Sequence, residues 1–406
     1  MSSQSMNENG PFRLPEVDRR VFLRGALAAG ASLSAAGLLA ACGGGGSTSA
    51  QTGAGAGGGS SATVSKGFPS YYPKDYQSIV DAAKKENGLT IYSNMAEYNW
   101  QPIIDAFKQK YPFVGDISTN NLDSAEVFQR YYAESSSGKS AASFMVSGDP
   151  TSWIEFIKKH QAAADYTSPE LPKLPDFAAP LPNLYTFSTD PILLAYNKAL
   201  LKENERPKGM KDLAAMVKKD PSRFQHKLTT YDVQNSFGFA IEYVWSQKYD
   251  GAWDLLDTIL PMVRPEQSSG PMVDKINSGE YLAGFFMSST VVLPQAEKSG
   301  AILGWNYIAD GTPMMFRGMG IPKTAPQMAT AKLMLDFLLS HDGQIAIYKG
   351  GFTPFRKDLT KDEAPRSYSA IAQEVGKDNL INVGYEEIST AQNKAFVSKW
   401  NGAMKA

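Results

Sequence analysis

The chain has 406 residues, and its 40 lysines and arginines nearly balance 41 aspartates and glutamates, for a formal net charge of -1. This balance gives no electrostatic reason to expect nucleic acid as a partner. A single cysteine, Cys42, excludes a disulfide within the chain.

The N-terminal segment has the composition of an export signal. Arg19-Arg20 followed by Val21-Phe22-Leu23 resembles the twin-arginine motif Ser/Thr-Arg-Arg-x-Phe-Leu-Lys, although Asp18 and Arg24 depart from it at the two ends. Export by the general secretory route therefore stays open. Residues 25–41 are rich in Ala and Gly and short for a bilayer span, which favours the apolar core of a cleavable signal.

A lipid-attachment pattern ends this signal. Leu39-Ala40-Ala41-Cys42 resembles the lipobox of bacterial lipoproteins, in which the cysteine is acylated and becomes the new N-terminus. The alternative is an ordinary Ala-x-Ala cleavage site beside a stray cysteine. We expect residues 1–42 to be a signal peptide ending at lipidated Cys42. Residues 43–67, almost all Gly, Ala, Ser and Thr, are expected to form a flexible linker.

About 340 residues follow, enough for two domains or one two-lobed unit. Hydrophobic spacing predicts helices and strands in alternation. The predicted helices cover residues 76–87, 99–111, 125–135, 153–160, 237–248 and 327–340, and the predicted strands cover 89–92, 143–146, 227–230 and 282–287. This alternation predicts an α/β architecture with mostly parallel sheets.

Small polar residues recur where a predicted strand or loop gives way to a helix. They are Ser93, Asn94, Ser147, Asp149, Thr230, Tyr231, Ser268, Ser269, Ser289 and Thr290. Each of these junctions alone has the composition of an ordinary helix cap. Ligands of open α/β sheets, however, bind beside the carboxyl ends of strands, where helix N-termini offer N–H groups to an anionic or polar molecule. As a set, these residues predict a ligand-binding site.

Four phrases, in this order and spacing, resemble one family. They are LTIYSNMAEYNWQPIIDAFKQKYP, DPILLAYNKALL, SSGPMVDKINSGEYLAGF and AKLMLDFLLSHDGQ. The similarity runs from about Tyr76 to Leu359. It is to the solute-binding proteins of ABC importers, in the iron(III)-type branch of the type II periplasmic-binding fold.

The resemblance implies two α/β lobes with a ligand cleft between them. Lobe 1 would comprise residues 68–186 and 310–406, and lobe 2 residues 187–309. The chain would cross between lobes near residues 184–194 and 305–320, and the lobes would close on the ligand by a hinge motion.

The same resemblance bears on metal binding. Ferric members of the family hold iron with two adjacent tyrosines, and these positions fall on Ser289 and Thr290; a histidine ligand of some members falls near residues 95–97, where there is none. Ferric iron prefers anionic oxygen donors, so hydroxyls are poor substitutes. We therefore expect no metal ligands and no cofactor, and keep a ferric-iron or iron-chelate binding protein as the alternative.

The Ser289-Thr290 pair suits an organic ligand that carries a carboxylate, phosphate or phosphonate. Arg317 is a candidate to clamp such an anion, or else a solvated hinge arginine. Asp149, in contrast, would favour an amine on the ligand. Aromatic residues near the crossings either stack on the ligand or pack in the core; they are Tyr185, Phe187, Trp305 and Tyr307.

Enzyme motifs are missing from the predicted folded part. It has no G-x-S-x-G nucleophile elbow and no metal-binding His or Cys cluster, although paired carboxylates cannot be recognised from spacing alone. We predict a monomeric, non-enzymatic substrate-binding component of an ABC importer. It would be lipid-anchored in the periplasm or on the cell surface, with permease transmembrane subunits as partners. A solute sensor with the same fold is a second alternative.

Overall fold

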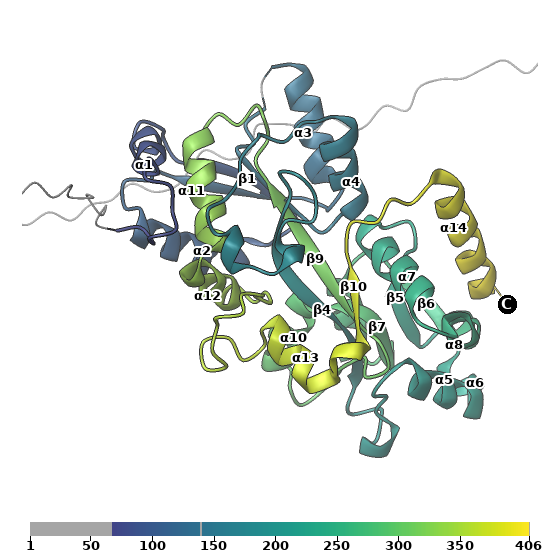
Figure 1. Ribbon diagram of the computed structural model, residues 1–406. Helices are drawn as coiled ribbons and strands as arrows, with labels where there is room; N and C mark the ends of the chain where they lie inside the picture. The colour runs from purple at the N-terminus through teal and green to yellow at the C-terminus, as the bar shows by residue number, and fades with distance from the viewer. Residues whose placement is uncertain (1–66, 139, 406) are drawn as a thin grey trace, which may run out of the picture. The chain divides into compact units, whose positions relative to one another are not determined.

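The computed structural model describes residues 67–138 and 140–405. The predicted export signal, lipidated Cys42 and the linker up to residue 66 lie outside the described residues. The described chain forms two α/β lobes whose sheets share long central strands (Figure 1). None of its helices is long and apolar enough to cross a membrane.

The first lobe contains strands β1 (Leu89–Ser93), β2 (Ile117–Asn121) and β3 (Phe144–Ser147), with β1 parallel to both neighbours. Successive side chains of a strand point to opposite faces, so Ile91 and Tyr92 enter different hydrophobic clusters. One face is covered by α1 (Gln77–Ala83), α2 (Glu97–Lys110), α11 (Met328–Leu339) and α12 (His341–Lys349). The other is covered by α3 (Glu126–Ser136) and by α4 (Pro150–Ile154), which continues as a π-helix over Glu155–Lys159.

The second lobe contains β5 (Leu228–Tyr231) between parallel neighbours β6 (Val263–Glu266) and β7 (Ala283–Ser288), with β8 (Leu303–Tyr307) beyond the shared strand. Its helices are α5 (Met210–Lys219), α6 (Pro221–Phe224), α7 (Ser236–Lys248), α8 (Ala252–Ile259), α9 (Ser269–Ser278) and α10 (Ser289–Lys298). Helix α7 is buried on all sides from Phe237 to Ser246, as a helix that is apolar all round should be.

Strands β4 (Tyr185–Asn197) and β9 (Thr312–Gly320) connect the lobes. The first half of β4 pairs antiparallel with β9, and its second half pairs antiparallel with β7 and β8. The chain therefore passes from one sheet to the other within a single buried strand, at the place the family resemblance implied. The sheets are parallel within each lobe and antiparallel at these crossing strands, a mixture that strand–helix alternation alone does not predict.

The C-terminal segment returns to the second lobe. After α13 (Tyr368–Val375) and β10 (Leu380–Val383), which pairs with β9, helix α14 (Thr390–Lys405) packs Phe396 and Trp400 into the second-lobe core. In Figure 1, α14 lies beside α7 and α8. The predicted division into 68–186 with 310–406 and 187–309 remains a prediction, and these contacts favour placing residues 390–405 with the second lobe.

A third connection between the lobes precedes α14. The Tyr385 hydroxyl donates a hydrogen bond to the Phe316 carbonyl oxygen at 3.0 Å. Beside it, Glu386 forms an ion pair with Lys248 of α7 at 2.5 Å, and Glu387 forms one with Lys158 of the π-helix. The two adjacent glutamates thus contact different lobes.

The helices and strands predicted from hydrophobic spacing are present in the structure. Their ends differ from the predicted ones by a few residues, and the helix predicted at 153–160 begins earlier, at Pro150, with Asp149 as its N-cap. The elements that spacing did not predict include β2, β6, β8 and β10, which are short. The sheet edge formed by β2 matters most, because it carries part of the site described next.

Candidate functional site

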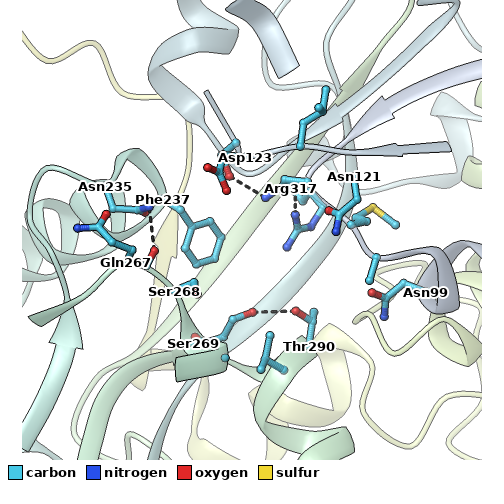
Figure 2. A pocket seen from close by; sticks show the side chains of 18 of the residues that line it. Asn99, Asn121, Asp123, Asn235, Phe237, Gln267, Ser268, Ser269, Thr290 and Arg317 are labelled. Carbon is cyan, nitrogen blue, oxygen red and sulfur yellow. Dashed lines mark hydrogen bonds between the residues drawn. The ribbon is translucent and has the colours of Figure 1, made fainter. Parts of the chain in front are cut away.

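A cavity of about 290 Å³ lies between the two lobes at the carboxyl ends of their strands. Residues from both lobes and from the crossing strand β9 line it, as Figure 2 shows. The lining comprises Asn94–Ala96, Tyr98, Asn99 and Asn121–Ser124 from the first lobe, Tyr231, Asn235, Phe237, Gln267–Gly270, Ser288, Thr290 and Val291 from the second, and Arg317 and Phe352.

Helices α9 and α10 begin at this cavity without side-chain caps. Their N-cap residues, Ser268 and Ser288, have capping side chains, yet neither hydroxyl accepts a hydrogen bond from the first turn of its helix. In other helices an N-cap side chain does so, as Asp149 does for α4 and Ser340 for α12. The first N–H groups of α9 and α10 therefore remain available to a ligand, with the positive end of each helix dipole behind them.

A chain of hydroxyl groups links the two helix starts. The Ser269 Oγ atom shares a hydrogen bond with the Tyr231 hydroxyl at 2.6 Å and accepts one from the Ser288 N–H at 3.0 Å. The Ser288 and Thr290 hydroxyls share another at 2.8 Å. Burial raises the pKa of Tyr231 to about 12, so its phenol stays protonated. This network fixes the positions of α9, α10 and the end of β5 relative to one another.

Arg317 projects from β9, and its side chain is held by the crossing strand β4 and by the first lobe. Its side chain is 3% exposed; Nε donates to the Asp190 carboxylate at 3.3 Å, and Nη1 donates to the Asn94 side-chain oxygen at 2.5 Å. Its guanidinium carbon lies 5.2 Å from the centre of the Phe352 ring. Within residues 67–138 and 140–405, Nη2 has no hydrogen-bond partner. The burial rules out the alternative of a solvated hinge arginine.

Asp190, behind Arg317, is fully buried on the crossing strand β4. It accepts hydrogen bonds from the Ser188 hydroxyl at 2.9 Å and from the Thr353 N–H at 3.1 Å. Burial raises the pKa of Asp190, and the neighbouring Arg317 charge opposes that rise. The aspartate thus orients the guanidinium toward the cavity.

Six of the predicted ligand-binding residues come together on the cavity wall: Asn94, Tyr231, Ser268, Ser269, Thr290 and Arg317. The other five lie outside it. Ser93 accepts a hydrogen bond from the Trp100 indole, Ser147 donates to the Ser124 carbonyl oxygen, Asp149 caps α4, Thr230 donates to Glu242, and Ser289 is buried in the first turn of α10.

The difference between the two groups follows from side-chain direction. Neighbouring residues at a strand end point to opposite faces, so Asn94 and Tyr231 face the cavity while Ser93 and Thr230 pack behind it. For Ser93, Ser147, Asp149 and Thr230 the structure supplies an internal partner, which agrees with the capping and packing alternative at those junctions.

Sequence reasoning missed the wall contributed by β2 and the loop after it. Asn121 and Asp123 line the cavity immediately before α3. They repeat the strand, polar residue, helix pattern of the other junctions, and recognising β2 would have found them. Asn99, Asn235 and Gln267 add further amide groups.

The aromatic residues of the cavity also differ from the predicted ones. Tyr185, Phe187, Trp305 and Tyr307 lie outside the lining, where Tyr98, Phe237 and Phe352 are found instead. The Phe237 ring packs so closely on Gly148 of the first lobe that a Cβ atom there would lie 2.8 Å from it. Phe237 therefore closes one side of the cavity against the opposite lobe.

Among the described residues, no three His, Cys, Asp or Glu side chains are grouped closely enough to hold a metal ion. The Tyr231 phenol that lines the cavity is already hydrogen-bonded to Ser269. The lining is instead rich in neutral hydrogen-bonding groups, which suit a polar organic molecule.

Comparison with known proteins gives the family. A family model described as bacterial extracellular solute-binding protein matches residues 102–373. The chain belongs to this family. The members of this family and the similar solved structures are solute-binding proteins. The predicted fold class, a two-lobed α/β structure of the type II periplasmic-binding kind, is confirmed by those structures.

Three of those structures illustrate the likeness. The substrate-binding protein of an ABC transporter from Agrobacterium tumefaciens has a TM-score of 0.71 at 16% identity, over 80% of this chain and 97% of that one. AfuA from Actinobacillus pleuropneumoniae, solved with fructose-6-phosphate, has a TM-score of 0.60 at 21% identity, over 79% and 99%. Iron-bound HitA from Pseudomonas aeruginosa has a TM-score of 0.59 at 17% identity, over 78% and 99%.

One curated relative also matches in sequence. An uncharacterized protein from Haemophilus influenzae is 28% identical over 160 residues, which is 39% of this solute-binding protein and 44% of the relative. The matched region thus spans less than half of that relative.

Proposed function

We propose that this protein is the substrate-binding component of an ABC importer and captures a small polar organic solute that carries a carboxylate, phosphate or phosphonate. The observation that carries the proposal is the pair of uncapped helix N-termini, α9 and α10, which share one cavity with the partly unpaired guanidinium of Arg317. Backbone N–H groups at helix starts and an arginine fork are the groups that bind oxyanions in proteins.

Binding proceeds by closure of the lobes over the solute. The anionic group of the solute hydrogen-bonds to the starts of α9 and α10 in the second lobe, while Asn94 and Asn121 contact the solute from the first lobe. A solute that touches both walls stabilises the closed arrangement through its higher affinity for that arrangement. No covalent bond forms or breaks.

The N-terminal segment would export the protein and attach it to the membrane. Export by the signal and acylation at Cys42 would tether the monomeric protein to the membrane, beside the transmembrane subunits of its permease. One acyl chain binds membranes only marginally, so durable anchoring requires more than one chain. The tether raises the local concentration of the loaded protein at the permease.

Native mass spectrometry of the full-length protein, extracted from membranes without refolding, tests this function. We expect one small molecule per chain, bearing an acidic group and released unchanged on denaturation. A compound that the protein converts to product would indicate an enzyme. A ferric charge-transfer band with equimolar iron would indicate the iron-binding alternative. A compound that binds but is still taken up at the normal rate by cells lacking the protein would indicate a sensor.

Two adjacent residues provide a matched pair of variants for the same experiment. Thr290 lines the cavity and Ser289 does not. Thr290→Ala should therefore lower the affinity for the identified compound about 10-fold, the effect of losing one hydrogen bond to a charged group, while Ser289→Ala leaves it unchanged. Equal losses in both variants would mean that the hydroxyls act only through the structure of α10.

A further inference from the structure

The cavity wall carries one basic and one acidic side chain, Arg317 and Asp123. The positive charge of Arg317 is not free, because the buried Asp190 carboxylate contacts its Nε atom at 3.3 Å from behind. Together these two groups are close to neutral when seen from the cavity. Asp123 is therefore the charged side chain of the wall that has no oppositely charged partner among the described residues.

Asp123 is exposed and lies at the end of β2, on the first-lobe wall. In the part of the chain that the structure describes, its backbone N–H donates to Glu126, but its carboxylate has neither a hydrogen bond nor an ion pair. Figure 2 shows Asp123 on the far side of the Arg317 guanidinium from Ser269 and Thr290. The carboxylate and the helix starts thus lie at separate parts of one cavity.

These two parts attract opposite charges. The starts of α9 and α10, with the unpartnered Arg317 Nη2, favour an oxyanion. Asp123 favours a cation, and the amide oxygen of Asn121, two residues before it in the chain, is an additional acceptor for N–H donors. A ligand with only negative charge would face Asp123 unfavourably, and one with only positive charge would face the helix starts unfavourably.

We infer that the solute is a zwitterion, with an oxyanion at the starts of α9 and α10 and a protonated amine at Asp123. The inference rests on the proposed function and narrows its substrate class. Asp123 then acts as a specificity-determining residue. When the lobes close on a solute that lacks the amine, the Asp123 carboxylate loses water without gaining a partner, which weakens binding about 10- to 100-fold.

Matched pairs of compounds test the inference by titration calorimetry on the full-length protein. Each pair consists of an ω-amino anion and its twin without the amine: β-alanine with propionate, 4-aminobutyrate with butyrate, 2-aminoethylphosphonate with ethylphosphonate, and taurine with ethanesulfonate. At least one aminated compound should bind 10- to 100-fold more tightly than its twin.

Two variants test whether Asp123 causes the preference for the aminated compound. Asp123→Asn should remove the preference for the aminated compound without changing the melting temperature of the ligand-free protein. Asp116→Asn, which changes an exposed carboxylate just before the other end of β2, should keep it. A preference that survives Asp123→Asn would contradict the role of this residue.

The remaining outcomes separate this inference from the proposed function. Equal binding of both members of every pair, or binding only of amine-free anions such as fructose-6-phosphate, would overturn the zwitterion and leave the proposed function intact. Failure of every compound to bind, with no small molecule in the native mass spectrum, would contradict both.

Discussion

Glu242 supports the cavity from behind, although its side chain does not line the cavity. The side chain is fully buried on α7; one carboxylate oxygen accepts a hydrogen bond from Thr230 at 3.2 Å, and the other has no partner among the described residues. Burial raises the pKa of Glu242 well above its ordinary value. The raised pKa favours the protonated form of Glu242. In that form Glu242 supports Thr230 at the end of β5, beside the cavity-lining Tyr231, without adding a negative charge behind the cavity.

Replacement of this residue should change the pH dependence of stability. A raised folded-state pKa means that the contribution of Glu242 to stability is complete below the pKa of the unfolded chain and falls as the pH rises toward the folded-state value. Glu242→Gln does not titrate, so its stability relative to the natural protein should increase between pH 5 and pH 8, by up to about 1.4 kcal/mol per pH unit. Urea unfolding at several pH values measures this.

The control for that experiment is Glu203→Gln, which changes an exposed glutamate. Its stability relative to the natural protein should not vary with pH in the same range. A Glu242→Gln difference that stays constant from pH 5 to pH 8 would show that Glu242 is ionised in the folded protein.

Helix α14 packs against the second lobe with one side and borders a cavity between the lobes with the other. Its aromatic residues Phe396 and Trp400 pack against each other and against Trp253 of α8. The other side of the helix, including Asn393 and Lys394, borders a second interlobe cavity of about 530 Å³ together with Thr151 of the first lobe. The helix is therefore fixed to one lobe and faces the other.

Truncation of its main anchor should loosen this helix. Trp400 is fully buried, so Trp400→Ala should lower the free energy of unfolding by about 3 kcal/mol or release α14 from the second lobe. Hydrogen exchange would show faster exchange confined to residues 390–405 in the second case. Lys405→Ala, in the same helix, should change neither quantity; an unaltered exchange rate and stability in Trp400→Ala would contradict the anchoring role.

At the scale of helices and strands, the sequence predicts which segments form these elements better than it predicts which elements and side chains lie next to one another. Helix α7 and strand β7 have long apolar runs and were predicted, whereas β2 has one strongly apolar residue, Ile117, because it is an edge strand paired only with β1. The hydroxyl-rich helix starts were predicted as a set. Their separation into lining and supporting residues was not, because it depends on side-chain direction at each strand end.

Long-range contacts explain the rest of what sequence reasoning missed. Arg317 contacts Asp190 across 127 positions of the chain, and no local pattern indicates that pairing. The same holds for the return of α14 to the second lobe, which depends on packing with α8.

On the scale of the whole molecule, the proposed function requires the two lobes to close on a ligand. Residues from both lobes line one cavity, and in the described part the chain passes between the lobes along the crossing strands β4 and β9 and again between α12 and α13. A ligand that binds the folded protein raises its stability by mass action.

This organisation predicts two linked changes on ligand binding. The compound released from the native protein, added back at 100 times its dissociation constant, should raise the free energy of unfolding by about 2.7 kcal/mol. Small-angle X-ray scattering should show a decrease in the radius of gyration over the same titration. Thr290→Ala should need about 10 times more compound for both changes. Stabilisation without compaction would indicate that the lobes are already closed when empty.

The hydrogen-bonded ribbon of β4 and β9, with residues 384–389 alongside, also limits the path of that motion. The hydrogen bonds between β4 and β9 oppose sliding of one strand along the other, so we expect the lobes to close by bending of this strand pair. We therefore expect the lobes to move relative to each other mainly along this one bending motion. Solutes of different size should then stop the same bending motion at different angles between the lobes.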